Sequence, residues 1–302
     1  FKEIFFYIKM TTVIISGAGL DIVKLLGLLH GSNIVNEDTK TIVGTSAGGI
    51  LGFAVLAKLN LLDVKDRLFD KINGRHIYDG NFFAGIMRFL TSSYFFKSDI
   101  RYFIIKELFR MAKIDIDITF KKLYRLIPTL FIVNAVSKNN GQMYYFSVDT
   151  QPKMKVFDAL LATSSLPIIF KPSILTLKDG TTHTFYDGGL RTFYCIQIFD
   201  KDSFDYYEND PAKPKAPTVE KVQGFLIQSE MSKIDTCIQP LNEILNTLQI
   251  IQKSVTANLN ISDLKNTIIL NCPQTEAYLD VLTLENLNND FNIGFYKGKE
   301  IA

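Results

Sequence analysis

The stretch KTIVGTSAGGILGFAV, Lys40–Val55, joins two apolar segments through a glycine-rich turn. The β-branched residues of its first part favour a short buried strand. The segment from Ala47 to Asn60 is apolar on nearly all sides, which predicts a buried helix. Between them, Gly44-Thr45-Ser46-Ala47-Gly48 matches G-x-S-x-G, the nucleophile elbow in which a serine lies between a strand and a helix.

Ser46 has two interpretations at this point: a catalytic nucleophile, or part of a glycine-rich turn that binds phosphate or nothing. Gly44 and Gly48 allow the helix to pack close to the strand. The helix N-terminus carries a partial positive charge that favours a developing alkoxide, and the Ala47 N–H can donate to an oxyanion. The context therefore favours the nucleophile, provided that a base is available.

The strand–turn–helix pattern also occurs earlier in the chain. Thr12–Ser16 predicts a strand, Gly17-Ala18-Gly19 a loop, and the residues up to Gly31 a helix. This repetition predicts an α/β fold with a mostly parallel central sheet flanked by helices, and Leu61–Leu126 adds helical insertions. Further strands are expected at 129–137, 142–148, around 178–183, 221–229 and 266–272, and further helices at 155–164, 243–259 and 285–301.

A chain of 302 residues suits one large domain. We expect a single α/β domain over residues 10–300, with the motifs in 12–190 and the rest of the sheet and helices in 221–300. Residues 1–9 are interpreted as an extension. The polar segment 201–220 contains three prolines and predicts an exposed loop.

The composition excludes several classes of protein. A hydrophobic content of 47% with 21% charged residues is globular, and a net charge of +2 gives no reason to expect nucleic-acid binding. The three cysteines are odd in number and lack metal-ligand spacing, so neither a disulfide framework nor a zinc site is expected. No apolar run has the length of a spanning helix. The expected location is the cytoplasm, because no signal segment is evident, and nothing in the sequence sets an oligomeric state.

The choice of base is narrowed by the scarcity of histidine. The chain has only His30, His76 and His183, and none follows His183, where a late triad histidine would lie. A triad esterase would have to use His183, in a polar segment expected to be a loop. Asp187, in FYDGGL, is the other candidate base, and an Asp-Gly hairpin turn is its alternative.

Four segments, in order, resemble the patatin-like phospholipase family. They are SGAGLDIVKLLGLL, VGTSAGG, ALLATSSLPIIFKP and FYDGGL, spanning Ser16–Leu190. The resemblance implies a patatin-like fold, a lipid ester substrate, no cofactor, and a catalytic dyad of Ser46 and Asp187. It also implies an oxyanion hole from the backbone N–H groups of Gly17, Ala18, Gly19 and Ala47, with motif support from Gly44, Gly48, Gly188 and Gly189.

One segment departs from the family pattern. Where the family has Gly-Gly-Gly-x-Arg/Lys-Gly, this chain has Gly17-Ala18-Gly19-Leu20-Asp21-Ile22. Asp21 adds negative charge near a site that must stabilise an anion. Lys24, one turn later, could restore a positive charge, but the sequence does not show its geometry. The alternative function is therefore a catalytically weakened or inactive lipid-binding or regulatory protein.

The segment from Ile77 to Phe109 is rich in aromatic residues and contains Arg88, Lys97, Arg101 and Lys106. It has two interpretations. One is an interfacial surface in peripheral contact with a membrane, with the cations at the lipid headgroups. The other is ordinary packing of helices in the core.

Overall fold

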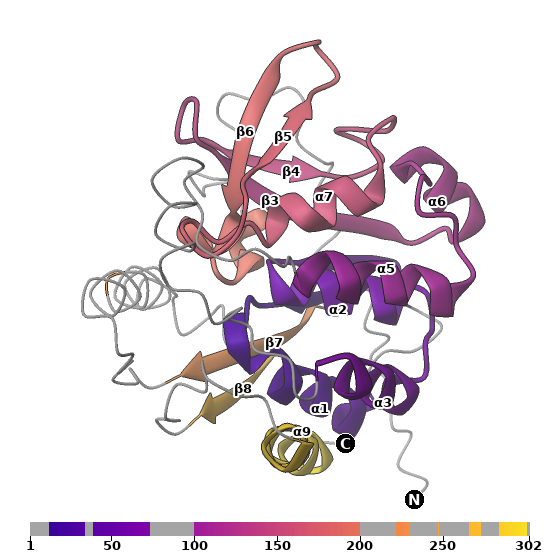
Figure 1. Ribbon diagram of the computed structural model, residues 1–302, viewed down its shortest axis with the longest axis vertical. Helices are drawn as coiled ribbons and strands as arrows, with labels where there is room; N and C mark the ends of the chain where they lie inside the picture. The colour runs from indigo at the N-terminus through magenta and orange to yellow at the C-terminus, as the bar shows by residue number, and fades with distance from the viewer. Residues whose placement is uncertain are drawn as a thin grey trace, which may run out of the picture.

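The computed structural model describes residues 12–33, 39–72, 100–199, 222–229, 247, 266–272 and 284–300. Within these segments, eight strands form one sheet in the order β5-β6-β3-β2-β1-β7-β8, with β4 paired to β3 (Figure 1). The strands are β1 Thr12–Ile15, β2 Thr41–Gly44, β3 Leu130–Ser137, β4 Met143–Phe146, β5 Ser173–Thr176, β6 Thr182–Asp187, β7 Val222–Ser229 and β8 Thr267–Cys272.

The centre of the sheet is parallel, as the sequence predicts. β3, β2, β1, β7 and β8 run in the same direction, and β4 and β6 join β3 by antiparallel pairing. Thr12 of β1 faces Thr41 of β2 on one side and Val222 of β7 on the other. The chain beyond residue 221 thus contributes two parallel strands beside the strand that precedes the first glycine loop.

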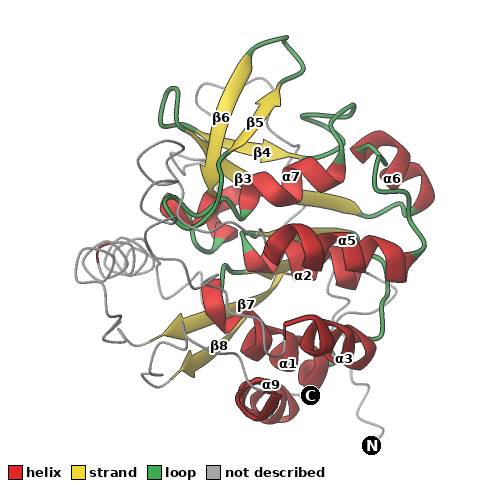
Figure 2. Cartoon of the chain, in the orientation of Figure 1, coloured by secondary structure: helices red, strands yellow, loops and turns green. Residues whose placement is uncertain are grey.

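The helices are α1 Ile22–Ser32, α2 Ala47–Leu56, α3 Leu61–Ile72, α5 Ile100–Ala112, α6 Phe120–Leu126, α7 Val156–Thr163 and α9 Leu284–Lys299. Figure 2 shows α1, α2, α3, α5 and α7 gathered on one side of the sheet. Successive strand residues face opposite sides: Val13 and Ile15 belong to the larger core under these helices, whereas Ile14 packs with Phe193 and Tyr194 on the other side. Both faces of the central strands are therefore covered.

The structure corrects two local predictions. α2 ends at Leu56 rather than near Asn60, because Lys58 adopts a left-handed φ of 53° and the Leu59 N–H bonds back to the Ala54 carbonyl. His183 lies on β6 and not in a loop. The predictions for residues 1–9 and 201–220, for 243–259 except for the helical Thr247, and for the aromatic segment before Ile100 fall outside the described residues.

One edge of β3 is shared by two strands that approach each other end to end. Gly44, the last residue of β2, faces Val133, and Asp187, the last residue of β6, faces Ala135. β4 occupies the opposite edge at both positions. β2 runs parallel to β3 and β6 runs antiparallel, so their carboxyl ends meet on this edge. The residues that follow β2 are thereby brought beside the end of β6.

Helix α9 packs along α1 through glycines on both helices, and the two lie side by side in Figure 1. A Cβ atom added at Gly27 or Gly31 would collide with carbonyl oxygens of α9, and one at Gly294 or Gly298 would collide with carbonyl oxygens of α1. The pairs Gly27/Gly31 and Gly294/Gly298 are each four residues apart, so they lie on one helix face. This spacing lets the two backbones approach directly.

Substitution of Gly294 by alanine is expected to destabilise the protein. An alanine gains about 1 kcal/mol over glycine in an exposed helix, but here its methyl group would meet the Lys24 carbonyl oxygen. Overpacking costs typically about 1–3 kcal/mol, so we expect a net loss in the free energy of unfolding, measured by urea denaturation. The control is Asn292→Ala on the exposed side of α9. If Gly294→Ala is as stable as this control, α1 and α9 do not pack closely at Gly294.

Candidate active site

Ser46 lies at the sharp turn between β2 and α2. Its backbone has φ 53° and ψ −121°, a strained conformation for a residue with a side chain. A Cβ atom at Gly44 would meet the backbone of Gly48, and one at Gly48 would meet the carbonyl oxygens of Ile15 and Ser16. Both glycines are thus required for the tight turn, which has the strand–serine–helix geometry of a nucleophile elbow.

Asp187 lies at the end of β6, with its side chain directed to Ser46. The Ser46 Oγ donates a hydrogen bond to Asp187 Oδ2 at 2.7 Å. The Gly189 N–H donates to Asp187 Oδ1, also at 2.7 Å, so both carboxylate oxygens are held. A Cβ atom at Gly188 would collide with Asn134 of β3. The hairpin alternative is therefore wrong: a strand and a short 3-10 turn, Gly188–Leu190, contain this segment.

The environment of Asp187 brings its pKa close to neutrality. Asp187 is 4% exposed. Burial raises its pKa to about 6, although the hydrogen bonds from Ser46 and Gly189 and the positive charge of Arg101 act in the opposite direction. A carboxylate with this pKa is deprotonated at pH 7 yet is a better proton acceptor than an exposed aspartate.

The first glycine loop follows β1 and lies beside Ser46. The Gly17 N–H donates to the Phe193 carbonyl at 2.8 Å, which removes it from the expected set of oxyanion donors. The N–H groups of Ala18, Gly19 and Ala47 have no backbone acceptor within the described segments. Gly19 has φ 53°, a conformation that favours glycine. Ala18 has φ −143°, so the alanine that replaces the second family glycine is accommodated without strain.

The C-terminal end of α7 contacts both members of the pair. Thr163 Oγ1 accepts a hydrogen bond from the Ser46 N–H at 2.9 Å. The Ser165 carbonyl accepts one from the Asp187 N–H, also at 2.9 Å. The sequence segment ALLATSSLP marks this region, but nothing in it indicates which residues touch the site.

His183 is separated from the pair along β6. It precedes Asp187 by four residues, and its Nδ1 lies 2.8 Å from Ser137 Oγ. Its ring packs against Tyr144 and Phe185. The hydrogen-bond partner of the Ser46 hydroxyl is therefore Asp187, and His183 belongs to a neighbouring aromatic cluster.

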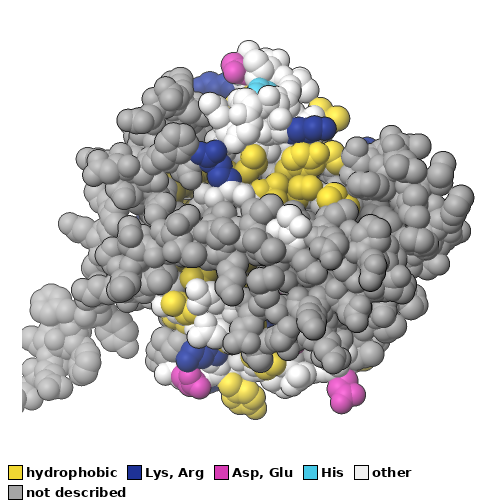
Figure 3. Space-filling model, turned by 90° about the vertical axis from the view of Figure 1, so that its left-hand side faces the viewer, with side chains coloured by type: hydrophobic (Ala, Val, Ile, Leu, Met, Phe, Trp, Pro, Cys, Tyr) yellow, Lys and Arg dark blue, Asp and Glu magenta, His cyan; other side chains and the backbone are white. Residues whose placement is uncertain are grey.

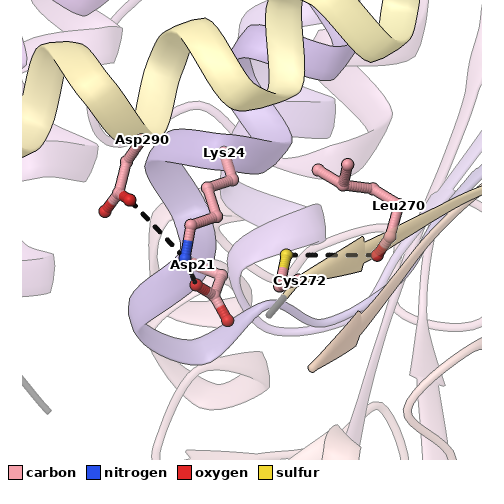
Figure 4. Close-up of polar contacts among 5 residues, drawn as sticks. All are labelled: Asp21, Lys24, Leu270, Cys272 and Asp290. Carbon is pink, nitrogen blue, oxygen red and sulfur yellow. Dashed lines mark hydrogen bonds and ion pairs between the residues drawn. The ribbon is translucent and has the colours of Figure 1, made fainter. Parts of the chain in front are cut away.

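Asp21 forms an ion pair with a buried lysine (Figure 4). Lys24 Nζ lies 2.6 Å from Asp21 Oδ1 and 3.5 Å from Asp290 Oδ1 of α9, and the lysine side chain is 1% exposed. Burial favours the neutral amine, but the two carboxylates outweigh it and raise the pKa of Lys24. Burial also raises the pKa of the nearby Cys272 to about 12, so its thiol stays protonated. The charge of Asp21 is thus directed into an ion cluster rather than left unpaired.

The described segments contain neither a cluster of metal ligands nor a membrane-spanning helix. No three His, Cys, Asp or Glu side chains within these segments come together as metal ligands. None of the helices in the described part of the chain is both long and apolar enough to cross a bilayer.

A strained serine between a buried strand and helix thus lies within hydrogen-bond distance of a buried aspartate at one edge of an α/β sheet. The family model for patatin-like phospholipase matches residues 13–200, and the chain belongs to this family. The match contains the elbow, the end of α7 and Asp187, but not β7, β8 or α9.

Three known proteins show the range of this similarity. The chain is 27% identical over 206 residues to a protein of invertebrate iridescent virus 6 named "Probable lipid hydrolase 463L", covering 68% of this chain and 67% of that one. It is 23% identical to the uncharacterized protein L620 of Acanthamoeba polyphaga mimivirus, covering 59% and 55%. The crystal structure of VipD from Legionella pneumophila has the same fold, with a TM-score of 0.54, 13% identity, and coverage of 97% of this chain and 66% of that one. The chain thus spans between about half and two thirds of the length of these proteins.

Removal of the Lys24 ammonium group is expected to destabilise the protein. Lys24→Met leaves Asp21 and Asp290 close together without a cation, and breaking a buried ion cluster typically costs about 3–5 kcal/mol. Because both carboxylates are 18% exposed, we expect the lower end of this range. The deficit should shrink at acidic pH, because burial raises the pKa of Asp290 and its protonation removes one of the two unpaired charges.

The control is Lys297→Met, which removes an exposed ion pair with Glu300 on α9 and should change the stability by less than about 0.5 kcal/mol. Chemical denaturation at pH 7 and pH 4.5 measures both variants. Equal stabilities for the two variants at pH 7 would show that Lys24 does not hold the cluster together.

Proposed function

We propose that the protein is a lipid acyl hydrolase that cleaves a carboxylic ester through Ser46 and Asp187. The observation that carries this proposal is the 2.7 Å hydrogen bond between the Ser46 hydroxyl and the Asp187 carboxylate at the nucleophile elbow. Membership of the patatin-like phospholipase family supports a lipid as the substrate.

In the first half of the reaction, Ser46 Oγ attacks the ester carbonyl carbon while its proton passes to Asp187 Oδ2. The carbonyl oxygen becomes an oxyanion, and we assign its stabilisation to the N–H groups of Ala18, Gly19 and Ala47. The C–O bond to the alcohol then breaks, and the alcohol leaves with the proton from Asp187. Ser46 is left as an acyl ester.

In the second half, water attacks the acyl carbon and Asp187 accepts its proton. Collapse of the second tetrahedral intermediate releases the fatty acid and returns the proton to Ser46 Oγ. The same carboxyl group thus acts first as base and then as acid in each half. Its pKa of about 6 suits both directions of transfer near neutral pH.

We also propose that the substrate is met at a membrane surface. Tyr102 and Phe103 in the first turn of α5 are 39% and 45% exposed, and Ile174 of β5 is 66% exposed. On the face seen in Figure 3, hydrophobic side chains gather beside Lys and Arg side chains in the upper part of the molecule. Aromatic and cationic groups side by side suit a lipid headgroup boundary.

A second candidate is a non-catalytic lipid-binding protein, favoured by Asp21 in place of the family's basic residue. The pairing of Asp21 with Lys24 weakens this reading. A fluorophosphonate probe distinguishes the two candidates, because it should label a hydrolase at Ser46 and leave a non-catalytic binding protein unlabelled. A binding protein should also keep its binding to vesicles in the Ser46→Ala variant.

Loss of either member of the pair is expected to abolish turnover. We expect Ser46→Ala and Asp187→Asn each to lower kcat by about 10³-fold or more, because the first removes the nucleophile and the second its base. Release of p-nitrophenol from a medium-chain ester measures the rate. Ser32→Ala in α1 and exposed Asp149→Asn are the matched controls. Wild-type rates in the Ser46 and Asp187 variants would refute the proposed pair.

The rate should depend on pH through Asp187. Only the deprotonated carboxylate can accept the Ser46 proton, so kcat/KM should rise about tenfold per pH unit below pH 6 and level off above it. A rate profile measured between pH 4 and pH 9 tests this. An acid limb centred near pH 4, the ordinary value for an aspartate, would show that Asp187 does not act as a buried base.

A further inference from the structure

Arg101 is a buried arginine in the first turn of α5, outside the four family motifs. It is 5% exposed, in a segment where the sequence suggested cations at a lipid surface. We propose that Arg101 is a positioning residue that aligns Ser46 and Asp187 by fixing the C-terminal end of α7. The inference rests on the proposed function, since it assigns a residue to that same site.

The guanidinium group of Arg101 donates hydrogen bonds to the chain where α7 ends. Nη1 donates to the carbonyl oxygen of Leu161 at 3.1 Å, to that of Ser164 at 2.5 Å and to Ser165 Oγ at 3.2 Å. Nη2 lies 3.4 Å from the Lys171 carbonyl oxygen. The carbonyl groups at a helix C-terminus lack partners within the helix and carry a partial negative charge, so a buried cation is favourable there.

The rest of the Arg101 side chain fixes the loop that follows. Its Cζ atom lies 4.1 Å from the centre of the Phe170 ring, within the range of a cation–π contact. Ser165 is held from three sides, because its Oγ also donates to the Leu161 carbonyl at 2.7 Å and lies 3.0 Å from Ser173 Oγ. Arg101 therefore contacts the chain at several points between Leu161 and Lys171, and Ser165 extends this network to Ser173.

This segment is the part of the chain that touches both members of the pair. Thr163 Oγ1 accepts from the Ser46 N–H, and the Ser165 carbonyl accepts from the Asp187 N–H. A shift in the end of α7 therefore displaces Ser46 and Asp187 relative to each other. A displacement of about 1 Å can cost about 10²-fold in rate, so the rigidity of this helix end matters for catalysis.

Arg101 also acts on Asp187 through its charge. The groups in the described segments that act on the Asp187 carboxyl are the Ser46 hydroxyl, the Gly189 N–H and the Arg101 guanidinium. Of these three, only Arg101 carries a full charge, and it opposes the effect of burial. Without it, the carboxylate should be harder to form.

A lysine at position 101 would supply the positive charge but could not hold the end of α7 in the same way. Its ammonium group supplies the charge, but arginine presents five donors in a planar fork that can reach several carbonyl oxygens and stack on Phe170 together. Arg101→Lys therefore retains the electrostatic effect and loses much of the alignment. Arg101→Gln loses both, which separates the two contributions.

The experiment compares wild type, Arg101→Gln, Arg101→Lys and, as a control on the same helix, Arg110→Gln, which removes an exposed side chain paired with Glu107. For each protein we would measure kcat and KM for a medium-chain ester, the pH profile, and the thermal melt. Arg101→Gln should lower kcat about tenfold or more with a smaller change in KM, and should move the acid limb above pH 6. Arg101→Lys should have the acid limb of its pH profile near the wild-type pH but a lower kcat than wild type. Arg110→Gln should behave as wild type.

A folded Arg101→Gln protein with wild-type kcat and an unmoved acid limb overturns the proposal. If Arg101→Gln does not fold, the Arg101→Lys variant tests the proposal. A wild-type kcat in Arg101→Lys would show that the planar guanidinium group is not needed for alignment, and would overturn the proposal. An inactive wild type, or an active Ser46→Ala, is instead a failure of the proposed function. In that case the effect of Arg101 on Asp187 can still be tested without turnover. NMR of ¹³C-labelled aspartate carboxyls would measure the Asp187 pKa in wild type and in Arg101→Gln. A raised pKa in the variant supports the effect, and an unchanged pKa overturns it.

Discussion

The hydrogen bond between Ser46 and Asp187 depends on two strands that end opposite each other on one edge of β3. Gly44 and Asp187 face residues of β3 that are two positions apart, which corresponds to roughly 7 Å along the strand. Residues separated by 141 positions in the chain are thus brought within 2.7 Å by the topology of the sheet, and not by a local motif.

Glycines make this geometry sterically feasible. Gly44 and Gly48 let α2 start directly against the strands, and Gly188 lets the chain after Asp187 pass close to Asn134. Burial and neighbouring charges then determine the protonation of Asp187. Burial raises the pKa of Asp187, while Arg101 and two hydrogen bonds keep the carboxylate accessible near neutral pH. Next to the glycine loop, Lys24 pairs with Asp21 and links it to Asp290 of α9.

Local sequence patterns predict much of this arrangement. β-branched runs followed by glycine turns indicate β1, β2 and the parallel sheet, and the motif residues indicate Ser46 and Asp187 as one site. The contacts that complete the site are long-range and leave no local signal. The Gly17 N–H is engaged by Phe193, 176 residues later. Arg101 resembles a surface cation in an aromatic segment, and only the three-dimensional structure shows it at the end of α7. His183 looks like a loop residue because its polar neighbours face outward from β6.

The most direct test of the account is to trap the acyl-enzyme. The wild-type protein would be mixed with a p-nitrophenyl ester, quenched in acid within the first turnover, and mapped by peptide mass spectrometry. The account predicts an acyl adduct on Ser46 that forms with a burst of p-nitrophenol and is absent from Asp187→Asn. Turnover without any adduct on Ser46, or an adduct on another residue that persists in Ser46→Ala, would contradict the central claim.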